Sequence, residues 1–174
     1  MSEIKKICFY GPESTGKSVM ARHLAEVYHT EYVPEVAREF VSTNNFTLED
    51  IIKIGHAHIA RVNEKTKTAN KVLFCDTDII TTQIYCRHYL GQVPEVLFEL
   101  EKMITYDQYF LFDIDVPWVP DGMRDLKERR AEMYQVFKDE LVKRKISFIE
   151  VKGIYEEREK QLRDWIDMIL VVDV

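Results

Sequence analysis

The sequence lacks two features that would indicate a membrane or a nucleic acid as a partner. It contains no run of about 18 apolar residues, the length that indicates a membrane-spanning helix. It also lacks an excess of basic residues: its net charge is −6, whereas phosphate backbones select for clustered Lys and Arg. A local basic pocket for a few phosphates stays compatible with this charge. We therefore expect no membrane span and no nucleic-acid-binding surface.

Cysteine is scarce, and the N-terminus has no leader-like segment. Cys8, Cys75 and Cys86 are an odd number without paired spacing, so we expect reduced structural thiols, as in cytosolic proteins. Residues 1–6 run directly into a strand-like segment, with no long apolar stretch before a small-residue cleavage site. This pattern indicates no signal peptide and predicts a cytoplasmic location.

Apolar strand-like runs alternate with segments of helical spacing along the whole chain. No repeat, linker or low-complexity segment divides the 174 residues, which suits a single domain, residues 1–174. The alternation predicts an α/β fold with a parallel sheet covered on both faces. The expected strands are 4–10, 32–33, 72–75, 109–114 and 146–151. The expected helices are 17–28, 48–67, 79–90, 94–104, 124–145 and 155–168, and Thr47 begins a capping box before the second of them.

Residues 11–18 read Gly-Pro-Glu-Ser-Thr-Gly-Lys-Ser, which matches G-x-x-x-x-G-K-S (the Walker A motif, or P-loop) between an expected strand and an expected helix. The backbone N–H groups and the helix N-terminus favour an anion there, and glycines let the backbone approach it. Lys17 would contact the outer phosphates, and the Ser18 hydroxyl would ligate Mg²⁺. The predicted ATP contacts are Gly11, Glu13, Ser14, Thr15, Gly16, Lys17, Ser18 and Val19. NTPases, switches and kinases share this motif, so it does not decide the reaction.

Carboxylates follow the strand ends, where ligands gather in a parallel α/β sheet. Asp76 ends the strand 72–75, and we predict that it binds Mg²⁺ or accepts the proton of an attacking hydroxyl. Asp78 is a second candidate for the substrate site, although it could serve only as the N-cap of the next helix. Asp113 and Asp115 end the fourth expected strand, and we interpret them mainly as solvent-exposed residues at the strand end rather than as site residues.

Glu35 follows the short strand 32–33 and could bind or deprotonate an acceptor hydroxyl. Arg38 lies three residues later, on the same face if this segment is helical. The alternative is a surface salt bridge that contributes little.

A turn-rich segment after the fourth strand resembles a lid, which we expect near residues 117–131. Phosphoryl transfer needs cations on the transferred group and exclusion of water, and Gly122 offers a hinge. Arg124 is the first candidate for the catalytic arginine. Arg129, which we predict to contact ATP, and Arg130 are the next candidates for a cation near the phosphates. The alternative is a solvated helix face, which a run of charged residues usually marks.

Trp118, in the same segment, could stack on a flat cationic ring, or it could belong to the core. His56 and His58 raise the possibility of a nucleotidyltransferase motif or a metal site. Lys53 stands where an H-x-G-H motif needs its first histidine, and side chains two apart on a helix point apart. We therefore favour helix packing or a substrate contact for these histidines.

Together these segments resemble the ribosylnicotinamide kinase domain of NadR-type NAD-salvage proteins. The matching segments are 11–18, 35–41, 55–56, 76–82 and 118–124, in the order of that family. The resemblance implies a three-layer, nucleoside-kinase-like P-loop fold with strand order 2-3-1-4-5. It also implies transfer of the γ-phosphate of ATP, with Mg²⁺, to the 5′-hydroxyl of nicotinamide riboside. Glu35, Arg38, Asp76 and Trp118 would then lie on the acceptor side, and Arg124 in the lid.

The sequence departs from the family pattern in two respects. The P-loop begins at residue 11, so we expect neither the adenylyltransferase domain nor the DNA-binding domain that such proteins carry upstream. Pro120 stands where an acidic residue is more familiar. The alternatives are a P-loop kinase for another nucleoside or small metabolite, and an ATP-binding regulatory module. The apolar residues 169–172 could pack on the sheet edge or on a second subunit.

Overall fold

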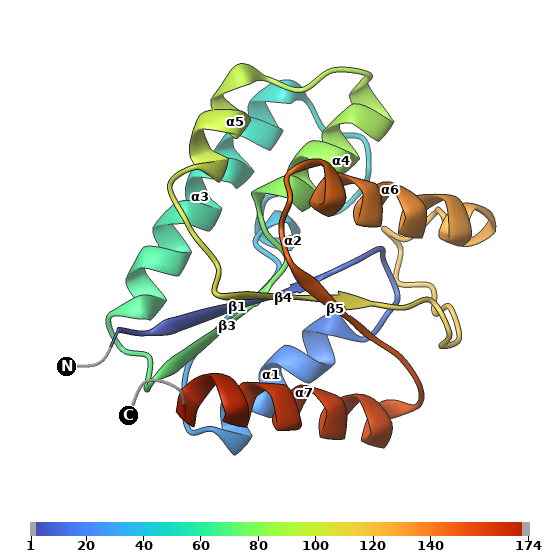
Figure 1. Ribbon diagram of the computed structural model, residues 1–174. Helices are drawn as coiled ribbons and strands as arrows, with labels where there is room; N and C mark the ends of the chain where they lie inside the picture. Colours follow the sequence, from blue (N-terminus) through green and yellow to red (C-terminus); the bar gives the residue numbers. More distant parts are fainter. Residues whose placement is uncertain (1–2, 172–174) are drawn as a thin grey trace.

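A parallel five-stranded sheet forms the centre of the protein. The computed structural model describes residues 3–171 (Figure 1). The strands are β1 Lys5–Tyr10, β2 Tyr32–Val33, β3 Val72–Asp76, β4 Gln108–Phe112 and β5 Phe148–Val151. Their order across the sheet is β2-β3-β1-β4-β5, and these neighbours all pair in parallel. The expected α/β fold and strand order 2-3-1-4-5 are therefore confirmed.

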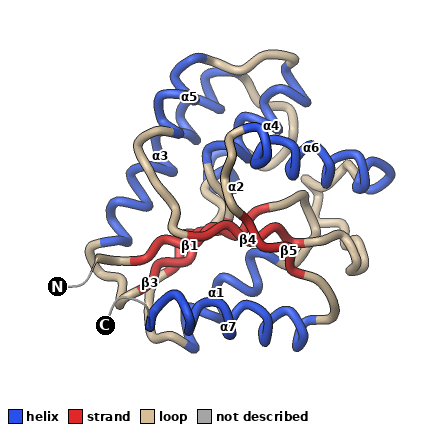
Figure 2. The backbone as a smooth tube through the Cα atoms, viewed as in Figure 1, coloured by secondary structure: helices blue, strands red, loops and turns tan. Residues whose placement is uncertain are grey.

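Helices cover both faces of the sheet. They are α1 Lys17–Val27, α2 Ala37–Phe40, α3 Leu48–Thr66, α4 Ile79–Leu90, α5 Glu95–Glu101, α6 Arg130–Lys143 and α7 Tyr155–Val171, with a 3₁₀ turn η1 at Lys127–Arg129. Figure 2 shows α1 and α7 on one side of the sheet and α3, α4, α5 and α6 on the other. The result is the three-layer arrangement that the alternating pattern predicts.

The apolar side chains of strand β1 are buried on both faces of the sheet, which explains the continuous apolar runs of the strands in the sequence. Ile7 and Phe9 pack with α1 and α7, while Cys8 and Tyr10 pack with α4 and α6. All four side chains are fully buried, because a parallel sheet covered on both faces leaves neither side to solvent. The three cysteines are buried and free, as expected.

Two expected elements differ from the structure near the lid. Helix α6 begins at Arg130 and not at residue 124, because residues 124–126 form a loop in which the Leu126 N–H donates to the Glu13 carboxylate. Strand β4 ends at Phe112 and not at residue 114. Asp113 still donates its N–H to Val151, but its own carbonyl turns to the side chain of Arg158.

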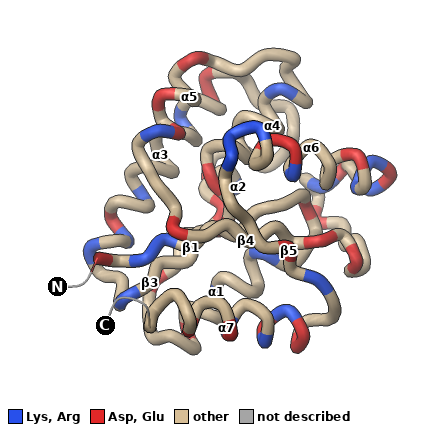
Figure 3. Tube along the Cα trace, in the orientation of Figure 1, with Lys and Arg blue, Asp and Glu red and all other residues tan. Residues whose placement is uncertain are grey.

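The last helix is longer than the pattern predicts. It extends to Val171, so residues 169–171 of the apolar tail belong to α7, and residue 172 lies outside the described residues. No helix within residues 3–171 has the length and apolar character needed to cross a membrane. Figure 3 shows Lys and Arg interspersed with Asp and Glu along the outer helices.

Candidate active site

The P-loop connects β1 to α1 in a conformation that requires its first glycine. Gly11 has φ 136°, and a Cβ there would lie 2.9 Å from the carbonyl oxygen of Phe112. Gly16, with φ 87°, is the N-cap of α1. Gly16 and the first residues of α1 line the cavity described below, where the N–H groups of the helix N-terminus favour an anion.

Lys17 is buried beneath this loop. Its Nζ donates to the carbonyl oxygen of Pro12 at 2.6 Å and to Thr15 Oγ1 at 3.2 Å. Burial lowers the pKa of Lys17, and the nearby Asp76 carboxylate opposes that effect. The ammonium is thus held against the loop and lines the cavity, where it can contact a phosphate that enters.

Asp76 meets Ser18 where β3 ends beside the P-loop. The Ser18 hydroxyl donates to Asp76 Oδ2, while Asp76 Oδ1 is buried and has no hydrogen-bond partner among the described residues. Burial, and next the charge of Glu35, raise the pKa of Asp76 to about 6.

This pair of groups fits a magnesium ion. Mg²⁺ in phosphate-binding sites takes one or two protein oxygens, and its other ligands are waters and phosphate oxygens. The hydroxyl of Ser18 and the carboxylate of Asp76, with its unpaired oxygen, are such a donor set. Residues 3–171 contain no cluster of three His, Cys, Asp or Glu that would hold a metal by protein ligands alone.

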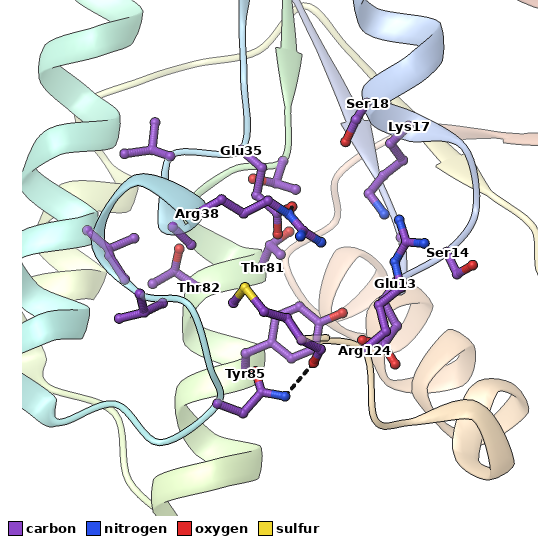
Figure 4. Close-up of a pocket in the computed structure, with 18 of the residues that line it drawn as sticks. Glu13, Ser14, Lys17, Ser18, Glu35, Arg38, Thr81, Thr82, Tyr85 and Arg124 are labelled. Carbon is purple, nitrogen blue, oxygen red and sulfur yellow. Dashed lines mark hydrogen bonds and ion pairs between the residues drawn. The ribbon is translucent and has the colours of Figure 1, made fainter. Parts of the chain in front are cut away.

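Glu35 and Arg38 face the P-loop from the end of β2 and from α2. Arg38 Nε donates to Glu35 Oε2 at 2.7 Å, and Arg38 Nη2 lies 2.6 Å from Asp121 Oδ2. Both side chains line the same cavity as Lys17 and Ser18, and Figure 4 shows them on the opposite side of it.

The cavity is about 140 Å³ and has two chemically different ends. The P-loop lines one end. The other end lies between α3 and α4 and is largely apolar, with Phe46, Ile51, Ile54 and Tyr85 in its wall. Such a cavity could bind a phosphate chain at one end and a flat organic group at the other.

The lid segment is docked on the P-loop. The Val119 N–H donates to the Ser14 hydroxyl at 2.7 Å, and the Leu126 N–H donates to Glu13 Oε1 at 2.7 Å. Arg130 donates to the carbonyl oxygen of Ser14 at 3.3 Å. Glu13 and Ser14, expected only as ATP contacts, therefore also hold the lid. Sequence reasoning missed this second role because both partners lie more than 100 positions away.

The structure separates the three lid arginines. Arg124 lines the cavity and lies close enough to Lys17 to lower its pKa. Arg129, expected to contact ATP, instead points outward, half-exposed and paired with Glu132, because it lies on the outer side of the turn before α6. The contact of Arg129 with ATP stays a prediction, and among the three lid arginines Arg130 is the one that donates to the P-loop backbone.

Asp78 and Trp118 lie outside the lining of the cavity. Asp78 Oδ1 accepts from the N–H and hydroxyl of Thr81, both at 2.9 Å, and Oδ2 accepts from the Tyr109 hydroxyl at 2.9 Å. This geometry fits the alternative reading of Asp78 as a helix N-cap. Trp118 is half-buried, with Lys127 Nζ 5.8 Å from its ring centroid. Its stacking on an acceptor stays a prediction.

Comparisons with known proteins show the family of the chain. The model of a protein family described as an AAA domain (AAA_28) matches residues 6–158 of the chain. The chain belongs to this family. It is 30% identical over 157 residues, 86% of its length, to the trifunctional NAD biosynthesis/regulator protein NadR of Escherichia coli K12. It spans 38% of the length of that protein. The resemblance to NadR-type proteins is therefore confirmed.

Solved structures show the fold of this AAA-domain chain. A NadR protein in complex with NR has a TM-score of 0.74 at 21% identity, covering 88% of this chain and 47% of that one. Thymidylate kinase from Candida albicans has a TM-score of 0.68 at 16% identity, covering 97% and 93%. The fold is thus that of P-loop nucleoside and thymidylate kinases.

Arg158, on α7, is a residue that sequence reasoning missed. Its side chain is buried and donates to the carbonyl oxygens of Thr15 at 2.6 Å, Gly153 at 2.7 Å and Asp113 at 3.0 Å. It also pairs with Asp115. Its position between Glu157 and Glu159 gave no indication of burial, since such a charge run is typical of a solvated helix face.

The histidines of α3 serve different purposes. His58 is buried, with Nε2 3.0 Å from the Tyr106 hydroxyl oxygen, and burial lowers its pKa to about 4. His56 is exposed, so the two do not share a site. Gly55 lies against α5, where a Cβ would meet Leu97 and Leu100 at 2.8 and 2.9 Å.

Proposed function

We propose that the chain transfers the γ-phosphoryl group of ATP to the 5′-hydroxyl of nicotinamide riboside and so forms nicotinamide mononucleotide. The observation that carries the proposal is a single cavity with Lys17 and Ser18 on one side and Glu35 and Arg38 on the other. This arrangement suits a donor phosphate that faces an acceptor hydroxyl. One solved NadR structure contains NR, and a second contains NAD and AMP-PNP, which supports this choice of acceptor and of an ATP-like donor.

The charge around the acceptor end favours a nucleoside over a nucleotide. Lys17, Arg38 and Arg124 are the cations among the described residues of the lining. Arg38 is already neutralised by Glu35 and Asp121. A monophosphate bound there would need an unpaired cation, which Arg38 does not offer. The apolar wall beyond would take the flat ring of the acceptor.

On this proposal the two candidate bases, Asp76 and Glu35, have different roles. Asp76 contacts Ser18, so we assign it to the Mg²⁺ side, where the ion would neutralise the phosphate oxygens when bound. Glu35 then takes the proton of the 5′-hydroxyl as the new O–P bond forms and the bond to ADP breaks. Lys17 and Arg124 stabilise the charge on the transferred group; loss of an arginine in such a role costs ~10³ in rate.

The test is ADP release with a panel of acceptors: nicotinamide riboside, thymidine, uridine and nicotinamide mononucleotide. We expect release with nicotinamide riboside and none with the mononucleotide. Turnover of thymidine or uridine but not of nicotinamide riboside would reject the substrate and keep the kinase class. If no acceptor raised ADP release above the basal rate, an ATP-binding regulatory module would be the better reading.

A variant pair tests the mechanism. Glu35→Gln should lower kcat by about 10²–10⁴ with little change in the KM for ATP, because Gln keeps an oxygen that can accept from Arg38 but cannot take the proton. Lys17→Met should instead weaken ATP binding as well. Equal kcat values for Glu35→Gln and the unaltered protein would exclude Glu35 as the base.

A further inference from the structure

Asp121 lies on the lid segment, and its carboxylate is shared by two arginines that line the cavity. Its Oδ2 is 2.6 Å from Arg38 Nη2 and 3.2 Å from Arg124 Nε. Its Oδ1 accepts the backbone N–H groups of Met123 at 3.1 Å and of Arg124 at 3.0 Å. One oxygen thus shapes the turn of the lid, and the other joins the two cations.

These contacts extend into a chain of alternating charge. Arg38 also donates to Glu35, so Glu35 is connected to the lid through Arg38 and Asp121. A second link supports the same contact, since the Asn44 amide donates to the carbonyl oxygen of Met123 at 2.5 Å. The lid therefore touches the acceptor side of the cavity at two points.

Electrostatics explains why an acid is needed at this position. Two guanidinium groups that line one small cavity repel each other unless a counter-charge lies between them. Partial burial opposes ionisation of Asp121, but the N–H groups of Met123 and Arg124 and the charge of Arg38 outweigh it and lower the pKa. Asp121 is therefore ionised at neutral pH and can hold both arginines near the cavity.

We propose that Asp121 is a positioning residue that couples occupancy of the acceptor end to the placement of Arg124 over the phosphates. The chemistry of this inference rests on the proposed function, whereas the docking of the lid does not. An acceptor that hydrogen-bonds to Glu35 weakens the contact between Glu35 and Arg38, so Arg38 interacts more strongly with Asp121. Asp121 transmits this change to Arg124. Coupling of this kind is reciprocal, so acceptor and ATP should strengthen each other's binding.

The first experiment measures the Kd of AMP-PNP with Mg²⁺, without and with saturating nicotinamide riboside. The unaltered protein should bind about 5–150-fold more tightly with the acceptor, which is the usual range of such coupling. Asp121→Asn keeps an oxygen for the two backbone N–H groups but loses the charge. Its ratio should fall toward one, whatever change the loosened lid makes to the Kd of AMP-PNP alone. Glu128→Gln is the charge-matched control, because Glu128 is exposed in η1 and has no ion pair with any described residue.

Kinetics adds a second readout. Asp121→Asn should lower kcat/KM for the acceptor by about 10–100-fold, as small displacements of catalytic groups do. In an Arg38→Gln background the same change should have a smaller effect, because the two residues act through one interaction. An unchanged ratio in the AMP-PNP measurement for Asp121→Asn, or no synergy in the unaltered protein, would overturn the coupling.

The lid can also be followed without any acceptor. The sequence has two tryptophans. Trp165→Phe on α7 leaves Trp118, which lies in the lid, as the only tryptophan that contributes to the fluorescence. In that background Asp121→Asn should make Trp118 more accessible to acrylamide, and unchanged quenching would overturn the docking role. If no nucleoside is phosphorylated but quenching still rises, the proposed function fails and the role of Asp121 in holding the lid stands.

Discussion

The guanidinium of Arg158 donates a hydrogen bond to the carbonyl oxygen of Thr15, 143 positions earlier in the chain, at 2.6 Å. Arg158 is 3% exposed and lies outside the lining of the cavity. The same side chain binds the carbonyl oxygens of Asp113 and Gly153. It therefore joins the P-loop to the ends of β4 and β5 and fixes the loop before any nucleotide binds.

Replacement of Arg158 should destabilise the protein. Arg158→Lys keeps the charge but cannot reach three carbonyl oxygens and a carboxylate at once. Breaking a buried, paired charge and its hydrogen bonds should lower the free energy of unfolding by about 2–4 kcal/mol. Urea denaturation measures this loss. Arg163→Gln is the control on the same helix: Arg163 is half-exposed, 3.6 Å from Glu159, and its loss should cost less than about 1 kcal/mol.

The features whose place in the fold could be predicted are those whose surroundings are set locally. The P-loop was predictable because strand, glycines and helix follow one another within residues 4–28, and the place of Asp76 beside it because Asp76 ends a strand of the same sheet. The roles of these residues in binding and catalysis stay predictions. Arg158 and the lid contacts of Glu13 could not be read, because their partners are brought together only by the fold. Asp78 shows a different limit, since an N-cap and a substrate carboxylate look alike in a sequence.

Asp76→Asn should stabilise the ligand-free protein and abolish turnover. The raised pKa of about 6, against 3.8 for a free Asp, means that the ionised form is disfavoured in the folded state. That cost is absent below pH 3.8 and complete above pH 6. The neutral variant should therefore gain about 1–3 kcal/mol at pH 8 and little at pH 4.

Two comparisons check this prediction about Asp76. Asp164→Asn, at an exposed pair with Lys160, should leave stability nearly unchanged at both pH values. Mg²⁺ with AMP-PNP should raise the melting temperature of the unaltered protein more than that of Asp76→Asn, because a ligand stabilises only what binds it. An active Asp76→Asn variant would contradict its assignment to the metal side.

Gly55→Ala tests whether this glycine serves packing. Alanine is the better helix former by about 1 kcal/mol, yet its Cβ would lie 2.8 Å from Leu97 Cδ2. Overpacking costs about 1–3 kcal/mol, so we expect a net loss of about 1 kcal/mol in urea denaturation. Adding Leu97→Ala should cost less than the two separate losses combined, because the second change removes one of the two close contacts of the new Cβ and leaves the one with Leu100. Additive losses would show that Gly55 does not pack against Leu97.

His58 should make stability depend on pH in a defined window. Its pKa is about 4 in the folded protein against 6.5 when free, because burial disfavours the imidazolium. The unfolded chain then binds more protons between these values, so this contribution to stability is complete above pH 6.5 and is lost as the pH falls toward 4. The full loss is about 3 kcal/mol.

A neutral replacement isolates this effect from other groups that titrate in the same range. Asp76 and Asp78, whose pKa values are also raised to about 6, change stability in the opposite sense, since they hold protons that the unfolded chain releases. They are present in both proteins and cancel in the difference. His58→Gln keeps a polar partner for the Tyr106 hydroxyl, so its unfolding free energy, followed by urea from neutral pH downward, should fall less than that of the unaltered protein. Parallel curves for the two proteins would mean that His58 is protonated in the folded state, and its burial would not control its charge.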